Sequence, residues 1–205
     1  FCDFCGETNQ NREELQRLSV SFGQGLQMTN ILKDIWEDYQ RGVCWLPQDL
    51  FLEHGFDLKQ LEFAKGSPEF AAGLTHMVGL AHGHLRNALS FTLLIPSEQA
   101  GIRRFCLLAI GLALLTLRKI QLNPRFARGN EVKVSRNAVK ATILTTNLAV
   151  GDDDRLRHLF RLTAANLPAL TPALVNYPKD LAPANAKAPK PKKPKKAKQS
   201  KQPKK

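Results

Sequence analysis

The sequence of 205 residues lacks the patterns of several common protein classes. No segment alternates apolar and polar residues as a half-buried strand does, and no glycine-rich fingerprint for a dinucleotide is present. We therefore predict an all-α fold. Long apolar runs are missing too, because the most apolar segment, residues 105–117, has 13 uncharged residues, whereas a membrane-spanning helix needs about 20. We expect this segment to be a central core helix.

Cysteine is scarce, with four residues in the chain. Cys44 and Cys106 stand in apolar contexts, as free buried thiols do in a reducing compartment. Cys2 and Cys5 are spaced like two zinc ligands, but no second Cys or His pair stands at ligand spacing to complete a site. One predicted helix holds three histidines without the i,i+4 spacing of metal ligands, and we expect them to be solvated or hydrogen-bonded: His76, His82 and His84.

Acidic residues are absent from the C-terminal end of the chain. Residues 181–205 hold ten lysines and no acid, which leaves +2 of the formal charge of +12 for the other 180 residues. Alanine, proline and lysine cannot bury apolar surface, and we expect residues 168–205 to form a disordered basic tail. Such a tail gains about 1 kcal/mol per lysine close to anionic lipid. We favour peripheral contact with an anionic membrane over nucleic acid as its partner.

The chain opens at Phe1 in the middle of an apparent helix, with no Met and no signal-like stretch. We expect it to be the C-terminal part of a longer cytoplasmic protein, with residues 1–167 belonging to a helical domain. Start and stop signals include a Ser-Pro-Glu helix start at Ser67 and a stop at Gly55. The predicted helices span residues 10–40, 50–54, 68–94, 97–121, 135–150 and 152–166.

The clearest chemistry lies in residues 27–38. In a helix, Gln27, Asn30, Asp34 and Asp38 fall within an arc of roughly 80°, because their spacings are three, four and four. Two carboxylates one turn apart repel each other and therefore favour a cation between them. Oxygen ligands without His or thiol suit a hard ion such as Mg²⁺ or Mn²⁺, whose other positions take phosphate oxygens and water. This face is a candidate diphosphate site.

A solvated acidic face is the alternative interpretation of the same residues. Four apolar side chains crowd these turns and indicate a helix that is packed on several sides: Ile31, Leu32, Ile35 and Trp36. An acidic face on a largely buried helix needs a compensating partner, and this favours the cation site.

Residues 27–47 resemble the second aspartate-rich motif of the squalene and phytoene synthase family. In that family the pattern is Q-x-T-N-I-x-(R/K)-D-x-x-E-D, followed by R-G and by an aromatic-containing L-P or W-P. The sequence fills it at Gln27, Thr29, Asn30, Ile31, Lys33, Asp34, Glu37, Asp38, Arg41, Gly42, Leu46 and Pro47.

The resemblance extends along the chain. Residues 1–6 are similar to the family's Y-C-x-Y-x-x-G segment, but Phe1 and Phe4 replace both tyrosines, and no role of the tyrosine hydroxyl carries over. Further matches follow the squalene synthase version of the family, in its bacterial type, more closely than the phytoene version: Ile95-Pro96, Arg103, Phe105-Cys106, residues 113–117, Asn123-Pro124 and residues 132–136.

The resemblance implies part of an isoprenoid-synthase-type helical bundle. Its implied reaction is the head-to-head condensation of two farnesyl diphosphates to presqualene diphosphate, which NADPH reduces to squalene for sterol or hopanoid synthesis. A phytoene or dehydrosqualene synthase, which lacks the reduction, is the alternative within the family. From another class, the lysine tail alone suggests a non-enzymatic, basic-tailed helical binding protein.

The resemblance also implies roles for individual residues. Asp34, Asp38 and Asn30 would be catalytic and hold the metal ion, with Glu37 as an additional ligand. The implied diphosphate contacts are Gln27, Lys33, Arg41, Lys133 and Arg136. For the last two, an exposed basic loop is an equal alternative. No residues for NADPH are identified.

One aspartate pair supplies half of the clamp that two diphosphates need. The family places another aspartate-rich helix upstream, facing the first across an apolar cavity. We therefore expect this chain alone to be molten or insoluble, and inactive.

Overall fold

The computed structural model describes residues 11–172, and all regular elements within them are helices. This confirms the all-α prediction. The predictions for Phe1–Gly6 and for residues 173–205 lie outside the described residues. The elements are α1 (Arg12–Lys33), α2 (Ile35–Gln40), α3 (Gln48–Glu53), the 3₁₀ helix η2 (Leu58–Phe63), α4 (Pro68–Leu93), α5 (Ala100–Leu122), α6 (Gly129–Val132), α7 (Arg136–Ala149) and α8 (Asp153–Thr163).

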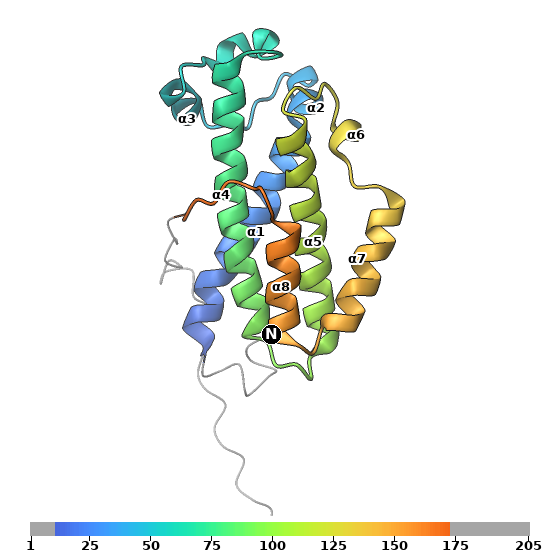
Figure 1. Cartoon of the computed structure of the whole chain (residues 1–205). Coiled ribbons are helices and arrows are strands. Elements are labelled where there is room, and N and C mark those ends of the chain that lie inside the picture. Colours follow the sequence, from blue (N-terminus) through green and yellow to red (C-terminus); the bar gives the residue numbers. More distant parts are fainter. Residues whose placement is uncertain (1–10, 173–205) are drawn as a thin grey trace, which may run out of the picture.

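Three long helices form the centre of the bundle. α1 packs against α4, and both pack against α5. α7 and α8 lie along the α5 side, while α2, α3 and α6 gather at one end (Figure 1). The core side chains of α4 and α5 include Val78, Leu85, Leu117 and Ile120, each with 0% of its surface exposed. Burial of this kind stabilises a helical bundle mainly through the hydrophobic effect.

α5 is the one described helix that is long and apolar enough to cross a membrane, judged by length and composition alone. In its most apolar window 44% of the residues are buried inside the bundle, and α5 packs against α1, α4 and α7. A core helix of a soluble bundle passes the same test. These contacts agree with the predicted role of residues 105–117 as a core helix.

Side-chain caps fix several helix starts, including the start that the sequence predicts at Ser67. The Ser67 side chain accepts a hydrogen bond from the Phe70 N–H, the Ser135 side chain accepts from Ala138, and the Asp152 side chain accepts from Arg155. Each cap satisfies a backbone donor that the first helical turn leaves unpaired. α5 begins at Ala100, three residues later than predicted.

The close approach of two helices explains one of the α1 glycines. A Cβ at Gly25 would lie 3.1 Å from Leu85 Cδ2 and 3.2 Å from the Leu85 nitrogen, so α4 crosses α1 at this point. The Thr29 hydroxyl donates to the Gly25 carbonyl over 2.7 Å. Gly23, the other glycine of α1, has no heavy atom within 4 Å of its Cβ position.

The predicted helix over residues 10–40 is interrupted at Asp34, and this part of the prediction is wrong. α1 ends at Lys33 and α2 begins at Ile35, with Asp34 at φ −100° and ψ 13°. Hydrogen bonds of 2.9 Å still run from Asp34 N–H to the Asn30 carbonyl and from Asp38 N–H to the Asp34 carbonyl. The two helices therefore follow one another closely. The break coincides with the place where α6, a helix that we did not predict, packs against α2.

A strap formed by residues 167–172 crosses α4 (Figure 1, orange). A Cβ at Gly79 would lie 2.9 Å from Leu170, and one at Gly83 would lie 2.4 Å from the Leu170 carbonyl oxygen and from Pro172. The two glycines lie one turn apart, and because they have no side chains the strap packs directly against the backbone of α4. Packed structure thus continues to Pro172, past the boundary that the sequence predicts at residue 168.

Two α4 histidines are buried and hydrogen-bonded. His82 Nδ1 lies 2.7 Å from the Pro168 carbonyl oxygen. His84 Nδ1 lies 2.8 Å from the Ser21 hydroxyl, which also accepts a hydrogen bond from the Asn87 amide. The third, His76, pairs with His54 at 2.9 Å. These contacts confirm the hydrogen-bonded alternative for all three.

The buried histidines predict a loss of stability in mild acid. Burial lowers the pKa of both His82 and His84, so the unfolded chain binds these protons at a higher pH than the folded chain. The contribution of these two histidines to the free energy of unfolding should be fully present above the unfolded pKa of about 6.5. It should be lost as the pH falls through the lowered folded pKa. Urea unfolding of the intact protein at pH 7.5 and 5 measures it. His84→Asn should make the free energy of unfolding less dependent on pH. His158→Asn is the control and should leave the dependence unchanged, because His158 is exposed.

Candidate functional site

The two aspartates of the motif lie on either side of the first turn of α2. Asp34 occupies the joint between α1 and α2, and Asp38 lies one turn further on. Asp34 Oδ2 is 3.2 Å from the Lys33 ammonium, and Asp38 Oδ1 is 3.5 Å from the Arg41 guanidinium. The Asp34 and Asp38 side chains remain 39% and 20% exposed. The structure therefore brings together two partly accessible carboxylates and two cations, all four predicted from the sequence.

Gln27 and Asn30 precede this joint on the exposed side of α1. Their spacing to Asp34 is seven and four residues, which keeps them on the same side of the helix. Both amides are thus open to a ligand that approaches the aspartates. Thr29 and Leu32, on the opposite side of the same turns, are buried.

Glu37 differs from the aspartates because it contacts another element. Its Oε1 accepts a 2.8 Å hydrogen bond from the N–H of Gly129, the first residue of α6, while its Oε2 is buried without a partner among the described residues. Glu37 therefore braces α6 against α2. Its role as a metal ligand stays a prediction.

Gly129 is a site residue that the sequence reasoning missed. A Cβ there would lie 2.9 Å from the Lys33 carbonyl oxygen, 3.1 Å from Glu37 Oε1 and 3.3 Å from Asp34 Oδ1. Only a residue without a side chain allows the α6 backbone to come so close to the acidic turn. The contact joins residues 92 positions apart, and nothing in the local sequence predicts it beyond the glycine in a polar connection.

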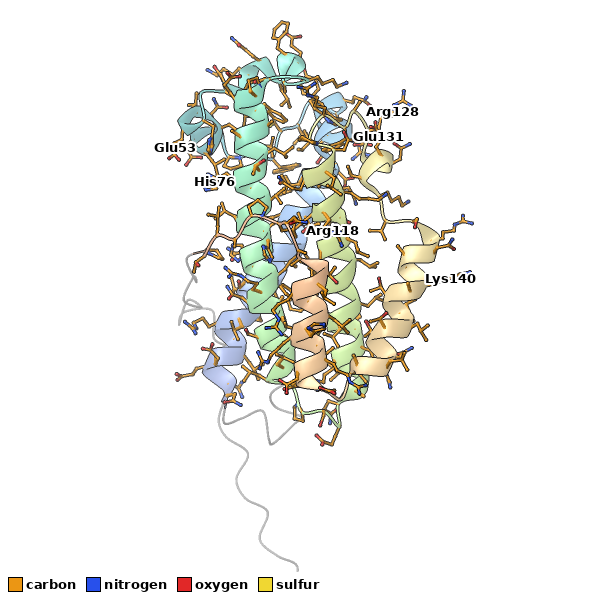
Figure 2. All side chains as sticks on the ribbon, viewed as in Figure 1. Glu53, His76, Arg118, Arg128, Glu131 and Lys140 are labelled. Atoms are coloured by element: carbon orange, nitrogen blue, oxygen red, sulfur yellow. The ribbon has the colours of Figure 1, made fainter. Side chains whose placement is uncertain are left out.

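The structure gives Lys133 and Arg136 no direct contact with the aspartates. Both are exposed, and neither forms an ion pair within residues 11–172. The backbone of Lys133 is fixed, because the Lys119 ammonium donates to its carbonyl over 2.7 Å. Lys133 directly follows α6, and Figure 2 shows the neighbouring Arg128 and Glu131 at the same end of the bundle. Diphosphate binding by Lys133 and Arg136 stays a prediction.

The loop after α2 lies beside Asp38. Asp38, Cys44 and Trp45 line one small cavity together with Ile31 and Ile35. Cys44 is nevertheless exposed, so the prediction of a buried thiol is wrong there, whereas Cys106 is buried as predicted. Trp45 is 64% exposed, so its ring is available to cover a bound ligand.

The donor set of the aspartate turn fits a hard cation. No group of three or more His, Cys, Asp or Glu side chains gathers at a metal-holding distance within the described part of the chain. Mg²⁺, however, commonly takes only one or two protein carboxylates and completes its shell with phosphate oxygens and water. Asp34 and Asp38, with the Asn30 amide beside them, offer such an incomplete, oxygen-only set.

An apolar cavity of about 270 Å³ lies between α5, α7 and α8. Its α5 wall is formed by Leu107, Ile110, Gly111, Leu114 and Leu115. A Cβ at Gly111 would lie 2.8 Å from Thr142 Cγ2 of α7, so this glycine sets the distance between the two walls. α5 therefore borders an apolar cavity in addition to packing in the core.

The cavity and the aspartate turn are connected through α5. One turn beyond Leu115, the side chain of Lys119 holds the Lys133 carbonyl, and α6, which ends at Val132, packs against α2. α5 thus lines the apolar cavity and also contacts α6, the helix that packs against α2.

Comparison with known proteins identifies the family of this bundle. Residues 3–138 match the family model described as squalene/phytoene synthase. The match covers more than half of the chain, and the chain therefore belongs to the squalene/phytoene synthase family.

Individual relatives match with lower identity. The chain is 35% identical to the phytoene synthase of Thermus thermophilus over 38% of this chain and 27% of the relative. It is 28% identical to a squalene synthase of Gibberella zeae over 62% of this chain and 27% of the relative, and 26% identical to the squalene synthase of Eremothecium gossypii over 70% and 32%. The chain spans about a third or less of the length of these relatives. No solved structure matches it.

Proposed function

We propose that this chain is the part of a head-to-head prenyl synthase that carries its second aspartate-rich motif. We propose further that the complete enzyme makes squalene from farnesyl diphosphate. The observation that carries the proposal is the turn at which Asp34 and Asp38 lie between Lys33, Arg41 and the α6 backbone. Membership of the squalene/phytoene synthase family supports it.

The residues suit the separation of charge that the reaction requires. Departure of an allylic diphosphate leaves an anion and a carbocation, and fixed cations stabilise the anion as it forms. Mg²⁺ bound by Asp34 and Asp38 would supply the Lewis acid, while Lys33 and Arg41 would contact diphosphate oxygens. The Gln27 and Asn30 amides would orient the group.

The apolar cavity supports the same proposal, because it offers a place for the hydrocarbon chain of the substrate. A carbocation survives only where water is excluded. The cavity walls of α5 and α7 are mainly aliphatic, with threonine as their polar contribution. We propose that part of a prenyl chain lies between them, with its diphosphate toward α6 and the aspartate turn.

The reductive step is the finer part of the proposal. Two relatives are squalene synthases and one is a phytoene synthase, so a product formed without NADPH is the second candidate. Incubation of the intact enzyme with farnesyl diphosphate and Mg²⁺, with and without NADPH, distinguishes them by the hydrocarbon formed. Squalene that appears only with NADPH supports the first. Absence of any hydrocarbon in both reactions would overturn the synthase proposal.

The basic tail is proposed to contact anionic membrane surfaces. Its charge lies in one segment, residues 181–205, with ten lysines and no acid. Cosedimentation of the intact protein with anionic vesicles at low salt, compared with a chain ending at residue 181, tests this contact. Equal binding by the two forms would contradict it.

Narrowing the cavity between α5 and α7 should impair substrate binding. Gly111→Leu places a side chain where a Cβ alone would lie 2.8 Å from Thr142 Cγ2. We expect KM for farnesyl diphosphate to rise by about 10-fold or more, because the leucine displaces a few methylene groups of the prenyl chain from the cavity. Steady-state kinetics of the intact enzyme measures it.

Gly101→Leu is the matched control, because this α5 glycine has nothing within 4 Å of its Cβ position. Circular dichroism checks that both variants fold. An unchanged KM in a folded Gly111→Leu enzyme would show that the prenyl chain lies elsewhere.

A further inference from the structure

A second groove lies between α4 and α8, away from the aspartate turn. It has a volume of about 430 Å³, within the range of small-ligand sites in proteins. One wall is a single face of α4, with side chains spaced by about one turn, and the other is a single face of α8. Figure 1 shows α8 beside α4, with the strap of residues 167–172 crossing above it.

Positive charge dominates this groove. Arg86 of α4 faces Arg157 and Arg161 of α8, which lie one turn apart, and no carboxylate is among the lining residues. Of the carboxylates at the start of α8, Asp152 pairs with Arg155 and Asp153 with Arg103, and Asp154 is not among the residues that line the groove. None of the three groove arginines forms an ion pair within residues 11–172. Three guanidinium groups without a counterion repel one another unless an anion joins them.

The strap fixes one of the three arginines in place. Arg86 Nη2 donates a 2.6 Å hydrogen bond to the Leu170 carbonyl. Its Nε is buried and has no partner among the described residues, which is costly for a charged donor. Arg86 is therefore held in one position with a donor still to be satisfied, as in a binding site formed before its ligand arrives.

An aromatic pair forms an apolar wall next to the arginines. His82 stacks on Phe160 with ring centroids 5.9 Å apart, and its Nδ1 is used by the Pro168 carbonyl. With Nδ1 donating, the neutral imidazole has Nε2 free as an acceptor, and the protonated ring gains a further donor there. The strap thus positions both Arg86 and His82.

We propose that the groove between α4 and α8 binds a phosphate or diphosphate group, as a site separate from the aspartate turn. Planar guanidinium groups bind phosphate oxygens bidentately, and a cluster of them is the usual protein surface for such anions. The site needs no metal ion, because the cations are provided by the protein. It does not depend on the diphosphate site of the synthase proposal, which is formed by α1, α2 and α6, although Leu89 and Phe160 line both this groove and the apolar cavity.

Isothermal titration of the intact protein with inorganic pyrophosphate, in the presence of EDTA and at low salt, tests the groove. EDTA removes any metal-dependent binding at Asp34 and Asp38. We expect saturable binding of pyrophosphate that weakens by about 10-fold or more in the variant Arg157→Gln/Arg161→Gln. The reason is that the variant loses hydrogen bonds between guanidinium groups and pyrophosphate oxygens, which are strong because both partners are charged. Arg104→Gln/Arg155→Gln is the control, because it removes the same charge at exposed positions outside the groove.

Three results decide the proposal. Selective weakening in the groove variant supports it. Equal affinity of wild type and both variants would assign the binding to other lysines and arginines and overturn it. Absence of binding by the wild type, to both pyrophosphate and phosphatidic acid vesicles, would overturn it as well. If the groove variant does not fold, the His82 ring signals of the wild type still report on the site by NMR, and they must shift as pyrophosphate saturates.

The vesicle measurement identifies the source of the phosphate. Cosedimentation with phosphatidic acid vesicles that falls in Arg157→Gln/Arg161→Gln, but not in the control, assigns the groove to a lipid headgroup. Pyrophosphate binding that falls while vesicle binding is unchanged assigns it to a free phosphate ligand.

Discussion

Asp34→Asn or Asp38→Asn in the intact enzyme is expected to lower turnover by about 10²-fold or more. Each substitution keeps the shape of the side chain and removes one of the two carboxylates available to Mg²⁺ at the α2 turn. Loss of a single group that stabilises charge in the transition state commonly has an effect of this size. Helix content should not change, because the backbone bonds from Asp34 to Asn30 and from Asp38 to Asp34 do not involve the side chains.

Asp49→Asn is the matched control for the aspartate variants. Asp49 lies in the first turn of α3 and is exposed, and its carboxylate accepts only from the neighbouring Leu50 N–H, which an amide oxygen also allows. Turnover is measured with farnesyl diphosphate across a Mg²⁺ titration. If both site variants kept near-normal turnover with the Mg²⁺ dependence of the wild type, Asp34 and Asp38 would be a solvated acidic face.

Arg103→Gln is expected to lower the free energy of unfolding by about 3 kcal/mol, the size typical of breaking a buried charged network. Arg103 is 2% exposed and joins three parts of the bundle. It donates to the Thr92 carbonyl at the end of α4, to the Val150 carbonyl after α7, and to the Asp153 carboxylate at the start of α8. Without it, the Val150 carbonyl and the Asp153 carboxylate lose this donor, while the Thr92 carbonyl keeps the N–H of Ile95.

Arg104→Gln controls for the loss of charge, because Arg104 is the next residue along α5 and is exposed. Urea unfolding of the intact protein at neutral pH measures both variants. Asp153→Asn should cost less than Arg103→Gln, since the Asp153 side chain is 46% exposed and water compensates part of the lost interaction. Equal stability of the Arg103 and Arg104 variants would mean that the buried network contributes nothing.

Arg103 also shows where sequence reasoning fails. In the sequence it is one of the charges that flank residues 105–117, and a charge at the end of an apolar run usually marks the helix surface. Its acceptors lie 11, 47 and 50 residues away. Local patterns carry no information about contacts at such separations, and the burial of this side chain follows only from the packing of the whole bundle.

Features that depend on neighbouring residues were predictable. The caps at Ser67, Ser135 and Asp152 involve donors three residues away, and the structure has all three. The 3–4–4 spacing likewise predicted which side of the helix carries Asp34 and Asp38. The break at Asp34 and the contact with Gly129 were not predictable, because they arise where α6 returns from a distant part of the chain.

The strap over α4 has a consequence for the order in which the protein is made. Gly83 leaves the ribosome 87 residues before Leu170, the residue that lies against it. At roughly 5–20 residues per second of synthesis, the interval is on the order of 4–17 s. During those seconds the glycine face of α4 and the Arg86 guanidinium are not covered by the strap, so this face is completed only when residues 167–172 emerge. A chain that stops before Leu167 is a bundle in which this face is never completed.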